Sequence, residues 1–157
     1  MTEPADIIRM LLDAGKTVAT AESCTGGMLG KLLTDVPGSS GAYLGGVISY
    51  TCPVKERLLG VDHNTLEQLG AVSKPVARQM AEGARTVIRA DFGIGITGLA
   101  GPDSDGSGKP VGLVYVALAG EGWTVSEELH LTGDRGEIRS AACEKALDML
   151  CRALVPQ

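Results

Sequence analysis

The feature that most constrains the fold is an alternation of two kinds of apolar segment along nearly the whole chain. Short runs rich in Val, Ile and Ala are typical of buried strands, and longer runs with apolar residues every three or four positions are typical of helices. The predicted strands cover 16–21, 42–50, 92–98, 111–119 and 123–131. The predicted helices cover 5–14, 25–36, 53–60, 64–70, 74–90 and 134–154.

The order of these segments indicates the fold class. Helices and strands interleave up to residue 98, which is typical of α/β proteins, whereas the last two strands follow each other directly and form a predicted hairpin. We therefore predict a three-layer α/β/α fold with a mixed, mostly parallel sheet. No repeat or linker interrupts the 157 residues, which suit a single domain over 1–157.

Composition disfavours several classes of partner. The net charge of −5 is unfavourable for nucleic acid, and one Trp, three Tyr and one Phe are too few for a base-stacking surface. No apolar stretch approaches the ~20 residues of a membrane span, and the acidic N-terminal segment is unlike a signal peptide. We predict a cytoplasmic protein without nucleic-acid or membrane partners.

Cysteine and histidine usage argues against a metal site. The four cysteines show no C-x-x-C pairing, and the two histidines, His63 and His130, match no zinc motif. We predict neither a disulfide nor a bound metal.

The stretch TAESCTGG, residues 20–27, places Ser23 between a predicted strand and a predicted helix that Thr25 would cap. The main-chain N–H groups of Thr25, Gly26 and Gly27 would then be free to bind an anion or a developing oxyanion. Ser23 is either a nucleophile held beside these donors or a helix-capping serine. Cys24 is the rival nucleophile, but no histidine is placed to serve it, and packing is the preferred interpretation.

Without a convincing histidine, the candidate base for Ser23 is a lysine. VISYTCPVKERLLG places Tyr50 at a strand end and Lys55 in the next helical turn. Lys55 acts as a base only if burial lowers its pKa well below ~10.4. Tyr50 would then relay the proton or orient the ammonium. The alternative is a surface lysine beside a packed tyrosine.

Two further segments bear on ligand binding. Residues 99–110, GLAGPDSDGSGK, match neither a Walker loop nor a calcium loop, and they are either a ligand loop at a strand end or a solvated connection. Arg135 lies in the first turn of the last helix, where a cation opposes the helix dipole. It either meets an anion or faces solvent.

Taken together, TAESCTGG, TDVPGSS, GGVISYTCPVKERLLGV, GAVSKPVARQMAEGAR, ITGLAGPD, KPVG and GDR resemble the CinA C-terminal family, in the same order and from about residue 17 to 136. The resemblance implies hydrolysis of the carboxamide of nicotinamide mononucleotide by a Ser–Lys amidase that needs no metal or cofactor. It places the nucleophile on Ser23 and the tyrosine and lysine on Tyr50 and Lys55. It further suggests a homo-oligomer. Substrate contacts are expected from Thr25, Gly26, Gly27, Ser39, Ser40, Gly98 and Arg135.

The sequence departs from the family pattern in two places. Thr51-Cys52 replaces the family's Ser-Asn, and the Gly-Pro-Asp-Gly-Gly loop reads GPDSDGSG. The larger N-terminal domain of two-domain members has no counterpart here, and none of its activities is expected. Two other functions stay open: a non-catalytic module that binds a pyridine nucleotide, and a serine hydrolase acting on another amide.

Overall fold

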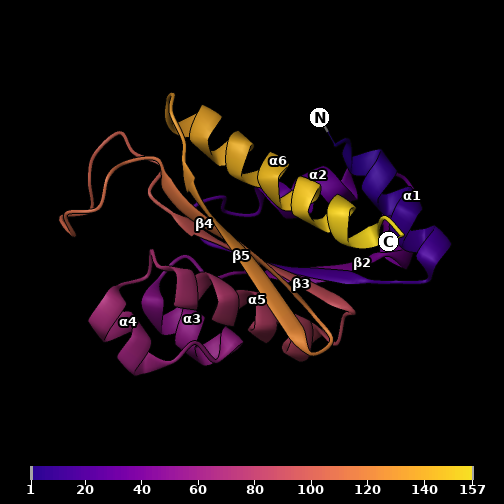
Figure 1. Ribbon diagram of the computed structural model, residues 1–157, viewed down its shortest axis with the longest axis horizontal. Helices are drawn as coiled ribbons and strands as arrows, with labels where there is room; N and C mark the ends of the chain where they lie inside the picture. The colour runs from indigo at the N-terminus through magenta and orange to yellow at the C-terminus, as the bar shows by residue number, and fades with distance from the viewer. Residues whose placement is uncertain (1, 157) are drawn as a thin grey trace.

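The computed structural model describes residues 2–156 and contains one five-stranded sheet with helices on both faces (Figure 1). The elements in chain order are α1 (Pro4–Ala14), β1 (Val18–Glu22), α2 (Met28–Thr34), a 3₁₀ helix (Ser39–Gly41), β2 (Tyr43–Ile48), α3 (Cys52–Leu59), α4 (His63–Leu69), α5 (Lys74–Ile88), β3 (Phe92–Gly98), β4 (Leu113–Gly120), β5 (Trp123–His130) and α6 (Arg135–Leu154). Within residues 2–156, no helix has the length and apolar character needed to cross a membrane.

The sheet is mixed, as predicted, with strand order β2-β1-β3-β4-β5. β1 pairs in parallel with both β2 and β3, and β4 pairs antiparallel with β3 and β5. β4 is therefore the only strand of this sheet that runs against the other four. The β4–β5 hairpin has no crossover because an antiparallel pair needs only a tight turn.

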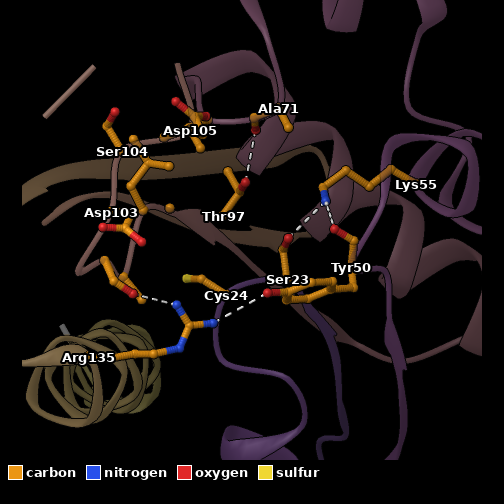
Figure 2. Close-up of a pocket in the computed structure, with 15 residues that line it drawn as sticks. Ser23, Cys24, Tyr50, Lys55, Ala71, Thr97, Asp103, Ser104, Asp105 and Arg135 are labelled. Carbon is orange, nitrogen blue, oxygen red and sulfur yellow. Dashed lines mark hydrogen bonds between the residues drawn. The ribbon is translucent and has the colours of Figure 1, made fainter. Parts of the chain in front are cut away.

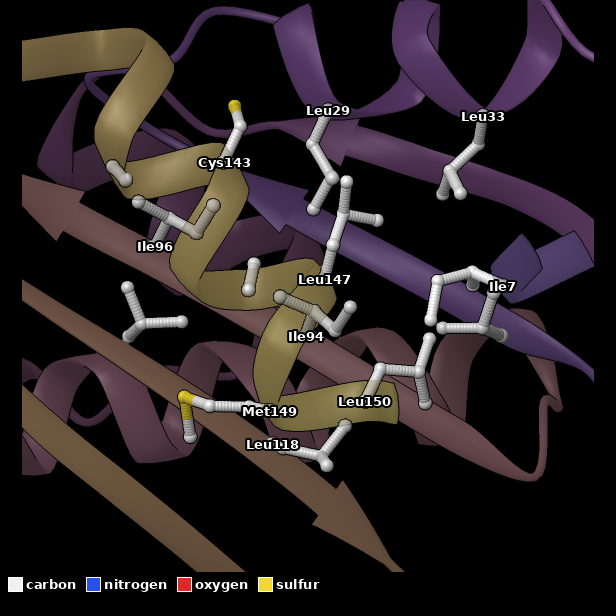
Figure 3. Packing of buried hydrophobic residues seen from close by; sticks show 14 of the residues in the cluster. Ile7, Leu29, Leu33, Ile94, Ile96, Leu118, Cys143, Leu147, Met149 and Leu150 are labelled. Carbon is white, nitrogen blue, oxygen red and sulfur yellow. The ribbon is translucent and has the colours of Figure 1, made fainter. Parts of the chain in front are cut away.

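The helices form two layers that cover opposite faces of the sheet, which confirms the three-layer architecture. α1, α2 and α6 cover one face, where Ile94 and Ile96 of β3 pack with Leu147 of α6 in the main hydrophobic cluster (Figure 3). α3, α4 and α5 cover the other face. There Gly95 faces α5 so closely that a Cβ atom would lie 2.4 Å from the Ala77 carbonyl oxygen. The missing side chain lets this helix rest directly on the sheet.

The chain path places a ligand-binding crevice at the carboxyl ends of β1 and β3. The connection from β1 to β2 passes through α2 on one face, and the connection from β2 to β3 passes through α3, α4 and α5 on the other. Consecutive connections therefore leave the sheet on opposite sides beside β1. Open α/β sheets bind ligands at such a switch point.

One helix start differs from the prediction. α2 begins at Met28 with Gly27 before it, so Thr25 is not its cap; its hydroxyl instead donates to Glu22. α5 begins at Lys74, as predicted. At α2, the buried Glu22 carboxylate takes the Thr25 hydroxyl that would have capped the helix.

Candidate active site

A pocket of about 330 Å³ opens at the carboxyl ends of β1 and β3 (Figure 2). Ser23 lies just after β1, and its N–H donates to the Ile96 carbonyl, so the end of the strand fixes its backbone. The walls come from five parts of the chain that are distant in sequence. The lining residues are Ser23, Cys24, Tyr50, Lys55, Ala71, Val72, Thr97, Gly98, Leu99, Ala100, Gly101, Asp103, Ser104, Asp105 and Arg135.

The structure brings Ser23 and Lys55 into direct contact. The Lys55 ammonium donates to Ser23 Oγ over 2.8 Å, and both residues are buried, with 1% of Lys55 and 7% of Ser23 exposed. Lys55 lies in the second half of the first turn of α3, and its side chain points at the end of β1. The surface-lysine alternative is therefore excluded.

Burial sets the protonation of Lys55. Removal from water lowers the pKa of its ammonium, because a charge in a poorly solvated place is disfavoured, while the nearby Cys52 and Cys24 thiols oppose this in part. Its other hydrogen-bond partners among the described residues are the Ser49 carbonyl at 2.7 Å and the Tyr50 carbonyl at 3.4 Å. Neither is a carboxylate that would hold the proton on the lysine. Neutral Lys55 is thus accessible nearer to neutral pH than a solvated lysine.

Tyr50 meets Lys55 through its main chain rather than its phenol. Tyr50 is 59% exposed, and its Oη accepts a hydrogen bond from Arg135 over 3.3 Å. Arg135 also donates to the Gly101 carbonyl over 2.6 Å, so it ties Tyr50 to the loop after β3 at the pocket mouth. The relay role predicted for the phenol finds no contact here; the orienting contact to Lys55 comes from the Tyr50 carbonyl.

The predicted anion-binding amides are only partly available. The N–H of Gly26 donates to the Ser23 carbonyl, and neither Thr25, Gly26 nor Gly27 lines the pocket. Among residues 2–156, the N–H groups of Cys24, Thr25 and Gly27 have no hydrogen-bond partner. Of these residues only Cys24 lines the pocket, so its N–H is the candidate oxyanion donor, which the prediction did not include.

An internal carboxylate occupies the start of α2. Glu22 is buried and accepts hydrogen bonds from the Thr25 hydroxyl at 2.7 Å, the Leu29 N–H at 2.9 Å and the Gly30 N–H at 3.0 Å. The orphan donors of this helix start are thus satisfied from within the chain. This is the physical reason why the helix start itself is not the anion site that the sequence predicted.

Cys24 is placed for packing rather than for nucleophilic attack. Burial raises the pKa of its thiol to about 11, so the thiol is protonated at neutral pH. It belongs to the main hydrophobic cluster, although one side reaches the pocket. This agrees with the preferred interpretation of Cys24.

Ser39 and Ser40 do not reach the pocket of this chain. They lie in the 3₁₀ helix before β2, next to Ala42, whose carbonyl accepts from Val18 at the start of β1. Because β1 and β2 are parallel, this is the amino edge of the sheet, about 16 Å from Ser23 at ~3.3 Å per residue. Their predicted contact with the substrate is therefore corrected for a single chain.

The loop after β3 does form part of the site. Gly98 lines the pocket together with Asp103, Ser104 and Asp105. Lys109 anchors the far end of the loop by donating to the carbonyls of Leu69 and Val72. The loop is therefore a pocket wall rather than only a solvated connection.

Three side chains at the site were not predicted from the sequence: Glu22, Thr97 and Arg139. Thr97 is buried on β3 and donates to the Ala71 carbonyl over 2.8 Å. Arg139 holds the turn after Ser23 from α6. Glu22 stands beside Ser23 in the sequence and could have been noticed as a charge within a buried strand. The contacts of Arg139 join residues more than a hundred positions apart and left no local signal.

Fold and site together define a mixed-sheet α/β protein with a buried Ser–Lys pair at the switch point of its sheet. The model of the CinA C-terminal domain matches residues 2–154. The chain belongs to the CinA C-terminal domain family.

Solved structures and curated relatives agree with this assignment. The chain is similar to a CinA superfamily protein of Escherichia coli, with a TM-score of 0.92, 33% identity, and 96% of this chain and 87% of that chain covered. It is also similar to the competence/damage inducible protein CihA of Agrobacterium tumefaciens, with a TM-score of 0.88, 40% identity and 98% of each chain covered.

Among curated proteins, the chain is 50% identical over 151 residues to a CinA-like protein of Anaeromyxobacter sp. and 49% identical over 144 residues to one of Syntrophomonas wolfei. These matches cover 96% and 92% of this chain. The chain spans about a third of the length of these relatives, with 37% and 35% covered.

Proposed function

We propose that this protein hydrolyses the carboxamide of nicotinamide mononucleotide to nicotinate mononucleotide and ammonia by a Ser–Lys mechanism. The observation that carries the proposal is the buried 2.8 Å contact between Lys55 Nζ and Ser23 Oγ, with burial lowering the lysine pKa. A hydroxyl becomes a nucleophile when an adjacent base takes its proton, and a desolvated lysine is such a base.

The reaction follows from this pair in two halves. Neutral Lys55 takes the proton of Ser23 as Oγ bonds to the amide carbon, and the carbonyl oxygen becomes an oxyanion facing the Cys24 N–H. Lys55 then gives its proton to the departing nitrogen, the C–N bond breaks, and ammonia leaves an acyl ester on Ser23. Water attacks the ester, Lys55 takes and returns the proton, and the acid leaves. One amide and one water give one acid and one ammonia.

The choice of a nucleotide substrate rests on the family resemblance and on the mouth of the pocket. Arg135 places a cation there, and its contacts to Gly101 and Tyr50 use two of its five N–H donors. The remaining donors suit a phosphate. We assign Tyr50 to the support of Arg135 and of the Lys55 ammonium.

The test is ammonia release from nicotinamide mononucleotide in the presence of a metal chelator. Wild type should release ammonia, Ser23→Ala should not, and Ser140→Ala, an exposed serine on α6, should match wild type. Equal release by Ser23→Ala would refute the serine mechanism.

The same assay separates the other two functions. Saturable binding of the mononucleotide without ammonia release would favour a non-catalytic nucleotide-binding module. Equal turnover of free nicotinamide and of the mononucleotide would favour a hydrolase acting on another amide, because phosphate recognition should distinguish the two.

A further inference from the structure

The turn between Ser23 and α2 is held by an arginine from the opposite end of the chain. Arg139, half-buried in the second turn of α6, donates through Nε to the Cys24 carbonyl and through a terminal nitrogen to the Thr25 carbonyl, each over 3.0 Å. No carboxylate pairs with Arg139 among residues 2–156, so these carbonyls are its partners. A guanidinium with this fork geometry fixes two peptide units at once.

The orientation of these peptides decides where their N–H groups point. In a trans peptide, the C=O and the following N–H lie in one plane and point in opposite directions. Because the Cys24 carbonyl points at Arg139 on α6, the Thr25 N–H points away from α6. Similarly, the Ser23 carbonyl is turned into the loop by the Gly26 N–H, so the Cys24 N–H points out of the loop.

Glu22 fixes the same turn from the other side. Its carboxylate holds the Thr25 hydroxyl and the first N–H groups of α2. With the carbonyls taken by Arg139 and the helix donors taken by Glu22, the N–H groups of Cys24, Thr25 and Gly27 have no partner within residues 2–156, and those of Cys24 and Thr25 lie in buried residues. Unpaired N–H groups in a buried turn are rare and call for an explanation.

We propose that Arg139 is a positioning residue: it holds the Thr25–Gly26 peptide, whose N–H holds the Ser23 carbonyl, and so aims the Cys24 N–H at the oxyanion that forms in front of Ser23 Oγ. This inference rests on the proposed amide hydrolysis at Ser23. Arg139 does not itself line the pocket and makes no hydrogen bond to Ser23; it acts through the Cys24 and Thr25 carbonyls that it holds.

The experiment compares Arg139→Ala and Arg139→Lys with Arg152→Ala, an exposed arginine on the same helix that pairs with Glu127. For each variant, kcat and KM for the mononucleotide, the melting temperature, and the rate at which a fluorophosphonate labels Ser23 are measured. Labelling needs the nucleophile and the oxyanion donors but not a particular amide.

We expect Arg139→Ala to lower kcat and the labelling rate by about 10–100-fold, approaching the loss of one oxyanion donor, with little change in KM. The kcat and labelling rate of Arg139→Lys should lie between those of wild type and Arg139→Ala, because an ammonium cannot hold both carbonyls in one plane. Added guanidinium should restore part of the labelling of Arg139→Ala, and Arg152→Ala should match wild type.

A lower melting temperature with unchanged kcat and labelling in Arg139→Ala would show a purely structural role and overturn the inference. A loss of labelling that neither guanidinium nor Arg139→Lys recovers would overturn it as well. If wild type is labelled but releases no ammonia, the proposed function fails and the labelling rates alone decide on Arg139. If wild type is not labelled at Ser23, the nucleophile is absent, and both the proposed hydrolysis and the positioning role of Arg139 are overturned.

Discussion

Replacement of Lys55 by methionine tests the central contact of the site. The change Lys55→Met keeps an unbranched side chain of similar length but removes the group that meets Ser23 Oγ and the Ser49 carbonyl. Because a general base contributes about 10²–10⁴-fold to a rate, ammonia release should fall at least about 10²-fold.

The same substitution has a predictable effect on stability. The Ser49 carbonyl loses its donor, which costs about 1–3 kcal/mol, but the folded protein no longer has to bury a charge. These effects oppose each other, so we expect Lys55→Met to fold with a free energy of unfolding near that of wild type at neutral pH. Loss of activity then reflects chemistry rather than unfolding.

The pH dependence of stability shows how burial of the Lys55 ammonium affects the folded protein. Burial lowers the pKa of Lys55 in the folded state below the ~10.4 of an unfolded chain, so between these values the unfolded state binds more protons. The free energy of unfolding of wild type therefore rises as pH rises through this window. Below the lowered pKa, Lys55 is charged in the folded state, and the full cost of burying that charge remains. Each unit of lowering corresponds to about 1.36 kcal/mol. Lys55→Met lacks this contribution.

The assay is urea unfolding of wild type and Lys55→Met at a series of pH values from neutral to about 10.4, beside ammonia release at each pH. The free energy of unfolding of wild type should rise relative to that of Lys55→Met as pH rises, and the acidic limb of kcat/KM in wild type should report a pKa below 10.4. A parallel pH dependence of the two stabilities, or ammonia release above about a tenth of wild type, would refute the reasoning.

Two further substitutions probe neighbouring groups. Cys24→Ala should keep turnover within about threefold of wild type and lower the free energy of unfolding by about 1 kcal/mol. The reason is that a buried thiol with a pKa raised to about 11 acts as a packing group. A loss of turnover of about 10²-fold would instead make Cys24 the nucleophile. Iodoacetamide should correspondingly modify the exposed Cys52 and spare Cys24 in the folded protein. Arg135→Ala should raise KM for the mononucleotide by about 10–100-fold, as expected for a lost charged hydrogen bond, and leave any turnover of free nicotinamide unchanged. An unchanged KM would remove Arg135 from the phosphate site.

Most of the fold was predicted from the local spacing of apolar residues. The alternation of strand-like and helix-like segments predicted the three layers and the mixed sheet, because burial on one or both faces dictates the spacing of apolar residues. Five of the six helix starts were predicted to within one residue, and only that of α2 was wrong. The start of α2 moved from Thr25 to Met28 because Glu22, seven residues before Leu29, supplies the buried acceptor.

The candidate site likewise contains residues that the local pattern placed correctly and residues that it misplaced. Ser23 was found from its place between a strand and a helix, which is a local property. Ser39 and Ser40 were misplaced because neighbouring turns in the sequence can stand at opposite edges of a parallel sheet. The direction of each strand decides this, and no local pattern records it.

The sequence by itself determined which residue types are present, their order, and the helix–strand pattern that puts Ser23 at the end of a central strand. Only the tertiary structure decided that Lys55 reaches Ser23 from α3, that its ammonium is buried with a lowered pKa, and that Arg139 holds the turn from α6. The physical reason is that desolvation and hydrogen-bond direction depend on every group packed around an atom. Most of those groups come from distant parts of the chain.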